Sequence, residues 1–138
     1  MSAEFHDNSV AVRAAMNDAV TRWLYEAAHA LKSQTQQNTA VDTGQLKNSW
    51  GVDLSQADSG VATVGSPLEN AVWEEFGTGE YALNGDGRKG GWFYEDDEGN
   101  GHFTRGKKPR RALHKAFETK KTPLIKLAEE IFKSEMGR

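Results

Sequence analysis

Residues 41–50, VDTGQLKNSW, lie where the hydrophobic pattern of the chain changes its period. Upstream, over about 10–37, apolar side chains recur every three or four residues and no Gly or Pro intervenes, which is typical of an amphipathic helix. Downstream, apolar residues alternate at Trp50, Val52 and Leu54, as they do in a half-buried strand. The stretch therefore marks a predicted boundary between a long helix and a β region.

We expect two β-hairpins beyond this boundary. In the first, a turn at residues 57–60 joins a strand near 50–54 to a strand at 61–64. In the second, the aromatic stretches 92–94 and 102–104 pair around an acidic, glycine-containing segment that forms a solvated tip. The two hairpins together predict an antiparallel sheet of about four strands.

Less regular segments complete the predicted architecture. Residues 66–79 open with a Ser-Pro turn and close with two glycines, and residues 81–91 are so rich in glycine that we expect a loop. The chain becomes helical again from Pro109, and a second helical segment is predicted to begin at Thr122-Pro123, a cap followed by proline. The order predicts one α+β domain over residues 1–138, with a long N-terminal helix, a C-terminal helix, and an antiparallel sheet covered by the helices on one face.

Composition restricts the classes of protein to consider. The chain has 138 residues, a mean hydropathy of −0.71 and no apolar run near the roughly 20 residues that span a bilayer, so we expect a soluble protein. Residues 1–10 mix acidic and polar side chains and lack the apolar core of a signal peptide, so export is not expected. Cysteine is absent, which excludes disulfides, thiolate catalysis and cysteine-ligated zinc and fits a reducing cytoplasm.

Charge is distributed unevenly along the chain. The net charge is −3, yet the basic segment, residues 105–121, has eight Lys or Arg residues and one acid. Such a segment is a solvated helix face, a phosphate-binding site or a surface for an acidic protein partner, and the sequence leaves all three open. It lacks the interleaved aromatic residues that base stacking requires. The candidate partner contacts within it are Arg105, Lys107, Lys108, Arg110, Arg111 and Lys115.

Residues 42–44 read Asp-Thr-Gly, the signature of aspartic proteases, which need two such carboxylates and hence, in a short chain, a symmetric dimer. That signature is expected at the end of a buried apolar strand, whereas the polar stretch 36–40 precedes it here. We therefore expect Asp42 to cap a short turn over residues 45–50, with Gln45 reaching back to it.

Other ligand-binding patterns are better explained by loops. Residues 85–90 match the GxGxxG string of dinucleotide-binding folds but lack the strand and helix that must flank it. Residues 96–101 resemble the first half of a calcium loop, yet Lys107 stands where a bidentate Glu is required. Glu74 and Glu75 are adjacent and diverge on any regular element, and the histidines show no metal spacing. We predict no catalytic residue, no cofactor and no metal site.

Three groups of residues carry a resemblance through their order and spacing. They are Val41, Asp42, Thr43, Gly44, Leu46, Lys47 and Ser49, then Glu75, Phe76, Gly77, Thr78 and Gly79, then Trp92, Tyr94, Thr104, Gly106 and Pro109. Over residues 41–117 they resemble the small neck or tail-completion proteins of long-tailed double-stranded DNA bacteriophages. The resemblance implies an α+β structural subunit without enzyme activity, in a ring that joins or completes the tail at the head–tail interface.

The resemblance also implies partners and a location. The partners would be copies of the protein in the ring and the neighbouring head–tail connector and tail proteins, with no membrane and no specific nucleic-acid binding. The protein would assemble in the cytoplasm of the bacterial host and reside in the virion. Gly44, Gly77 and Gly79 are expected to adopt backbone angles that other residues avoid.

The chain departs from this family pattern at one place. Similar proteins usually have Pro, Phe and Leu after the position of Pro109, whereas residues 110–113 read Arg-Arg-Ala-Leu. An electrostatic contact is therefore expected there instead of an apolar one. The alternative function is a small DNA-binding or packaging accessory protein that uses the same basic segment.

Overall fold

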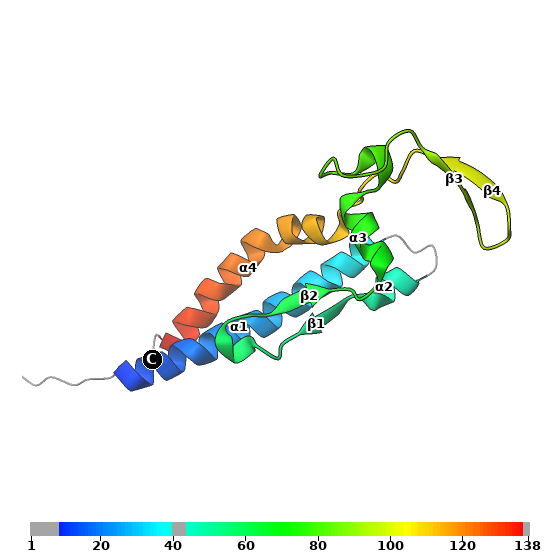
Figure 1. Ribbon diagram of the computed structural model, residues 1–138. Coiled ribbons are helices and arrows are strands. Elements are labelled where there is room, and N and C mark those ends of the chain that lie inside the picture. Colours follow the sequence, from blue (N-terminus) through cyan, green and yellow to red (C-terminus); the bar gives the residue numbers. More distant parts are fainter. Residues whose placement is uncertain (1–8, 40–43, 137–138) are drawn as a thin grey trace, which may run out of the picture.

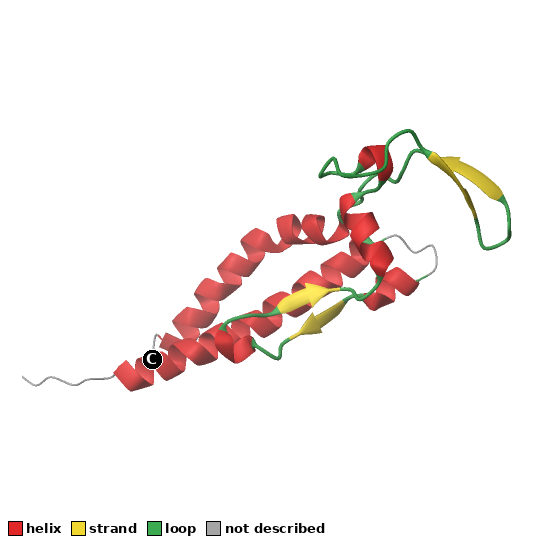
Figure 2. Ribbon diagram, viewed as in Figure 1, coloured by secondary structure: helices red, strands yellow, loops and turns green. Residues whose placement is uncertain are grey.

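The computed structural model describes residues 9–39 and 44–136. Two long helices, α1 and α4, pack along each other and form the body of the molecule (Figure 1). One small sheet packs on α1, and a second hairpin extends from the end of the body beyond α3 (Figure 2). The elements in chain order are α1 (Ser9–Asn38), α2 (Gln45–Ser49), β1 (Gly51–Asp53), η1 (Ala57–Ser59), β2 (Thr63–Gly65), α3 (Glu69–Phe76), η2 (Gly79–Tyr81), β3 (Trp92–Glu95), β4 (Gly101–Thr104) and α4 (Ala112–Met136).

The predicted α+β class, the long terminal helices and the four strands in hairpins are confirmed. Within the described residues, however, the strands form two separate two-stranded antiparallel sheets, β1–β2 and β3–β4, instead of one sheet under both helices. The two long helices pack mainly on each other. The β1–β2 sheet is small and covers only part of α1. We call residues 92–104, which contain β3 and β4, the arm.

Small side chains allow α1 and α4 to lie close together. Ala19 and Ala28 of α1 and Ala116 of α4 are buried, and so is Leu124 of α4. The indole N–H of Trp23 donates to the backbone carbonyl of Leu124 at 2.7 Å, which fixes the position of one helix along the other. Among the described helices, none combines the length and the apolar character that crossing a membrane requires.

The predicted start of a second C-terminal segment at Thr122-Pro123 is wrong, because α4 is a single helix that contains Pro123. Proline lacks the N–H that would bond the carbonyl of Thr119, and its ring crowds that carbonyl, so a bend is expected. Figure 1 shows the first turns of α4 set at an angle to the rest of the helix. Packing on α1 beyond the proline, including the hydrogen bond from Trp23, outweighs the local preference to stop.

The turn predicted after the Asp-Thr-Gly string is the short helix α2. Gly44 precedes it with a φ of 73°, in the left-handed region that favours glycine, and its carbonyl accepts the N–H of Asn48 at 3.0 Å. Asp42 and Thr43 lie outside the described residues, so the cap expected from Asp42 stays a prediction.

An apolar cluster joins α2 to α3 and to the start of α4. Leu46, Trp50 and Ala71 are buried, and Leu68 and Leu113 pack against them. No helix is predicted for residues 66–79, yet α3 forms there because its apolar face covers this cluster. The cluster therefore sets the position of the segment that follows α3.

The hydroxyl of Thr39 connects the end of α1 to this cluster. It accepts the indole N–H of Trp50 at 2.9 Å and donates to the carbonyl of Thr35 at 2.6 Å, and all three residues are buried. We expect Thr39→Val to lower the free energy of unfolding by about 2 kcal/mol in urea denaturation, because the buried Trp50 N–H loses its partner. Thr119→Val removes an exposed hydroxyl and should change it by less than about 0.5 kcal/mol. Equal losses in both variants would contradict this account.

Candidate interaction site

Two of the motif groups singled out in the sequence meet at one junction. The N–H of Thr78 donates to the carbonyl of Lys107 at 2.9 Å, and the N–H of Glu80 donates to the carbonyl of Arg105 at 2.9 Å. The hydroxyl of Thr78 also accepts the N–H of Lys107 at 2.8 Å. The segment after α3 and the segment after the arm are thus bonded side by side, and this glycine junction, residues 77–80 with 105–107, is the base from which the arm projects (Figure 1).

Glycine is required at this junction for both conformation and space. Gly77 and Gly79 have φ values of 76° and 61°, so the angles expected for them and for Gly44 are confirmed. A Cβ on Gly79 would lie 2.2 Å from the carbonyl oxygen of Arg105, and a Cβ on Gly106 would lie 2.1 Å from that of Thr78. The two backbones therefore touch at a distance that no other residue permits.

Glu75 ties α3 to the start of α4. Its two carboxylate oxygens accept the N–H groups of Leu113 and His114 at 2.8 and 3.2 Å, so a residue 38 positions away caps this helix. The residue is 8% exposed. Its carboxylate also lies 3.4 Å from Nε of Arg111, which has a left-handed φ of 58°. That Nε makes no hydrogen bond within the described structure, so the contact with Glu75 is electrostatic.

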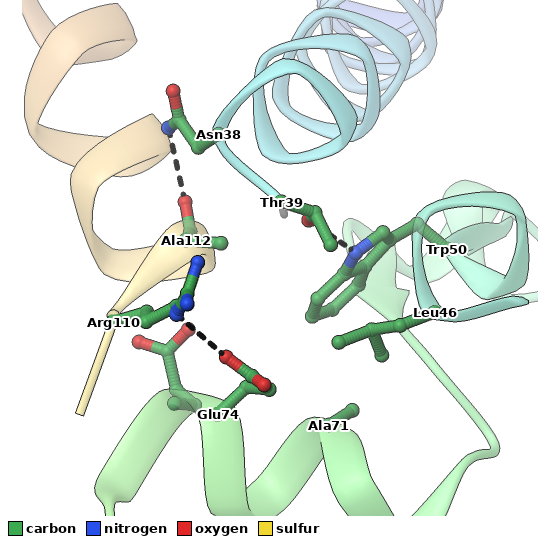
Figure 3. Close-up of a pocket in the computed structure, with 9 residues that line it drawn as sticks. Asn38, Thr39, Leu46, Trp50, Ala71, Glu74, Arg110 and Ala112 are labelled. Carbon is green, nitrogen blue, oxygen red and sulfur yellow. Dashed lines mark hydrogen bonds and ion pairs between the residues drawn. The ribbon is translucent and has the colours of Figure 1, made fainter. Parts of the chain in front are cut away.

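Two other acids, Glu74 and Glu80, form ion pairs with basic residues that precede Arg111. Glu74 forms ion pairs with Lys107 and with Arg110, the latter at 3.5 Å, and Figure 3 shows the Glu74 and Arg110 side chains directed toward each other. Arg105 lies 3.4 Å from Glu80. Four of the six candidate partner contacts therefore form ion pairs with acids of the same chain.

The other two cations are placed differently. Lys108 lies over the ring of Tyr81, with its ammonium 5.6 Å from the centroid. Lys115 makes no ion pair with any residue that the structure describes, and the same holds for Lys120 and Lys121. Cations without an acidic partner among the described residues therefore lie both beside the junction, at Lys108, and on the first half of α4.

The space beside Glu74 is too small for a substrate. Figure 3 shows this cavity, between the end of α1, α2, α3 and the start of α4, lined by Trp50, Leu46 and Arg110 among others. Its volume is about 10 Å³, at the lower limit for a single water molecule. In residues 9–39 and 44–136, no group of three or more His, Asp or Glu side chains is arranged to hold a metal ion.

The arm presents aromatic side chains on both faces. Phe93 and Phe103 are directly opposite in the register of β3 and β4, with ring centroids 5.0 Å apart. They are 81% and 51% exposed. On the other face, Tyr94 stacks on His102 at 5.3 Å, and the guanidinium of Arg88 lies over Trp92. Sequence reasoning placed the hairpin correctly but did not single out the two phenylalanines.

Hydrogen bonds within the arm explain its calcium-like tip without an ion. Asp96 accepts the N–H groups of Glu98 and Asn100 at 3.0 and 2.8 Å, and its other oxygen lies 2.8 Å from Nε2 of His102. These bonds to the ionised carboxylate, that from His102 above all, hold the pKa of Asp96 below its ordinary value of 3.8.

A pH titration tests this arrangement at the tip. Because the pKa of Asp96 is lowered in the folded arm, the bonds to the carboxylate are intact above that pKa and are lost as the pH falls through it. In carboxyl ¹³C NMR, His102→Ala should raise the pKa of Asp96 toward 3.8. Asp53, whose pKa is lowered by the N–H of Ser55, is the internal control and should not respond. An unchanged Asp96 pKa would contradict the account.

The remaining motif residues are mostly internal. Leu46 belongs to the apolar cluster, and Ser49 bonds through its hydroxyl to Ser66 at 2.6 Å. Pro109 packs against Gly77, because a Cβ on that glycine would lie 2.9 Å from the proline ring.

This geometry first defines a class: an α+β protein with exposed aromatic side chains on a projecting arm and lysines without acidic partners among the described residues on a helix face. A family model described as "Bacteriophage HK97-gp10, putative tail-component" matches residues 3–77, more than half of the chain. The chain belongs to this HK97-gp10-like family, as the resemblance in the sequence indicated. A structural role in a tailed phage, within the virion, follows from that membership. No curated protein and no solved structure gives a significant match.

Proposed function

We propose that the protein joins or completes the tail at the head–tail interface of a tailed bacteriophage or prophage, as one subunit of a ring. Family membership supports the structural role in the tail. The observation that carries the finer proposal is the presence of two different surfaces on one subunit: an arm with exposed phenylalanines and an acidic tip, and a helix face with unbalanced lysines.

Two unlike surfaces suit a ring better than a two-fold dimer. A two-fold contact uses the same patch on both partners, whereas a head-to-tail contact joins one patch to a different one and closes into a ring when the rotation permits. Opposite charge on the two patches favours that pairing and disfavours contact between identical patches. Copies of the protein, the connector and the neighbouring tail proteins are the partners in this proposal.

We assign the protein no catalytic role. The two acids that sequence reasoning weighed as a possible pair are engaged separately: Glu75 caps α4, and Glu74 binds Lys107 and Arg110. Each therefore has a structural use that explains its position.

Quantitative mass spectrometry of purified virions tests the proposal. We expect the protein to remain with particles through density-gradient purification, at one fixed copy number per particle and in covalent cross-links to connector or tail proteins. Recovery only from the soluble fraction of the lysate, with none in the particles, would contradict a place in the virion.

Lys115, Lys120 and Lys121, which have no acidic partner among the described residues, keep a DNA-binding accessory role as the second candidate. Charge reversal at Arg110 and Arg111 would not discriminate between the candidates, because both arginines are paired with Glu74 and Glu75. Lys115→Glu combined with Lys120→Glu and Lys121→Glu alters three charges of α4 without breaking an ion pair of the described structure. The ring proposal predicts loss of virion assembly with unchanged affinity for duplex DNA in fluorescence anisotropy. Tight, salt-dependent DNA binding that this variant abolishes would favour the accessory role.

A further inference from the structure

We propose that the arm of one copy docks into a groove on the next copy, with its two phenylalanines on the apolar floor and its acidic tip against α4. This inference rests on the proposed ring and names the contact that would build it. The receiving surface, which we call the α4 groove, lies between β2, α3 and the start of α4. Its lining includes Val64, Phe76, Leu113 and Phe117, together with His114 and the Glu75–Arg111 ion pair.

The arm is built in a way that requires a partner. A two-stranded hairpin alone in water is only marginally stable. Here the paired rings of Phe93 and Phe103 face solvent, and Phe93 is among the most exposed apolar side chains of the described chain. Covering this pair would remove a large apolar area from water and would stabilise the hairpin at the same time.

The α4 groove has a size and an apolar lining that suit aromatic side chains. It is an open depression of about 420 Å³, enough for aromatic side chains. Phe76 and Phe117 are partly exposed within it and supply apolar surface. Most of its lining residues are apolar and form what we call its floor, and its polar members are Glu75, Arg111 and His114. Protein interfaces likewise combine an apolar centre with polar groups.

Charge sets the direction in which the arm would lie. Residues 95–98 at the tip are consecutive acids, Glu-Asp-Asp-Glu. Beyond the groove, the first half of α4 carries Lys115 and, one turn after Phe117, Lys121, neither of which pairs with an acid among the described residues. If the phenylalanines lie on the floor and the tip points along α4, the acidic tip faces these lysines, and the opposite charges favour that direction.

The occupant is the arm of another copy and not the molecule's own. Figure 1 shows the arm projecting from the α3 end of the body and away from α4 and β2, which border the groove. The glycine junction bonds the base of the arm in that direction through Thr78 and Glu80. A contact from the arm of one subunit to the groove of the next is head-to-tail, so it can repeat around a ring.

The chain contains no cysteine, so two introduced cysteines can test the contact directly. Gly101 is opposite Glu95 in the arm, on the face that carries the phenylalanines, and a Cβ there meets no atom within 4 Å. His114→Cys places the second thiol at the groove, where that side chain is half exposed. The double variant, treated with a short bismaleimide in virions and as concentrated purified protein, should give a ladder of covalent oligomers. Gly101→Cys paired with Val10→Cys, at the far end of α1, should give none.

A matched pair of surface variants separates docking from folding. Phe93→Ser in the double-cysteine protein should reduce the cross-linked yield about tenfold while the Tm of the uncross-linked protein stays unchanged, because the side chain is exposed in a single copy. Val10→Ser changes a side chain of similar exposure, 80%, and should leave the ladder intact.

The outcomes distinguish this inference from the proposed function. A protein that stays in virions but forms no ladder there or in solution overturns the arm–groove contact and leaves the place in the virion standing. Cross-linking of the arm to a different virion protein, in place of a second copy, overturns it as well. A ladder from a protein absent from virions supports the contact and overturns the proposed function.

Discussion

Glu75→Gln should lower the free energy of unfolding by about 3 kcal/mol and the Tm by about 10 °C. The substitution keeps the shape of the side chain but removes the charge that accepts the N–H groups of Leu113 and His114. It also leaves Arg111 beside a neutral group, with a buried Nε that has no hydrogen bond in the described structure. Hydrogen bonds to a charged acceptor contribute more stability than neutral ones, and a partly buried cation that loses its partner adds a further cost.

Thermal unfolding followed by circular dichroism measures this effect, and Glu130→Gln is its control. Glu130 is exposed on the same helix that Glu75 caps, so the same substitution there should change stability by less than about 0.5 kcal/mol. If Glu75→Gln were as mild as the control, the cap would not contribute to holding α4 against α3, and the fold would depend on the helix pair alone.

Gly79→Ala should lower the free energy of unfolding by about 3 to 4 kcal/mol and should separate the two segments at the base of the arm. Its φ of 61° is unfavourable for alanine, and the added methyl would lie 2.2 Å from the carbonyl oxygen of Arg105. The methyl can be accommodated only by separating the two bonded segments, so the hydrogen bonds of Thr78 and Glu80 to the 105–107 segment would be lost. Limited proteolysis should then cleave between α3 and α4 much faster than in the unaltered protein.

Gly85→Ala isolates the steric part of that effect. Gly85 has a similar φ of 69°, but a Cβ there meets no atom within 4 Å. This variant should lower the free energy of unfolding by only about 1 to 2 kcal/mol, which is the cost of a left-handed backbone at alanine without any steric clash. The proteolysis pattern should stay unchanged. Equal losses at both positions would mean that close backbone contact at the junction is not what requires glycine.

Elements encoded by local pattern were predictable from the sequence. The apolar residues of α1 recur at helical spacing without interruption, and the observed helix, Ser9–Asn38, differs from the prediction by one residue at each end. Both hairpins followed from alternation around turn residues. The short turn predicted over residues 45–50 is the helix α2, Gln45–Ser49.

Features that depend on partners distant in the chain were not predictable in this way. Glu75 caps a helix that begins 37 residues later, and nothing in the local string around it identifies that use. Pro123 was predicted to begin a new helix, because proline is common at the first position of a helix. In the structure it lies inside α4, which packing on α1 keeps continuous. The division into two sheets also depends on the direction of the arm, which the glycine junction fixes.

The candidate site was predicted in part. The spacing of the motif residues identified Gly77, Gly79 and Gly106, which the structure brings together, but not the contact between them. The basic segment was identified as a charged surface, whereas four of the five cations in its first part form ion pairs with Glu74, Glu75 and Glu80. Ion pairs of this kind can be identified only from the three-dimensional structure, because the sequence around one partner does not show which distant residue it contacts.

Electron microscopy of lysates from a phage or prophage that lacks this reading frame, with and without the protein supplied in trans, tests the central claim most directly. The account predicts DNA-filled heads apart from complete tails, or tails that are aberrant at the end that meets the head, and restoration by the protein in trans. Intact, infectious particles in the absence of the protein would contradict a role at the head–tail interface.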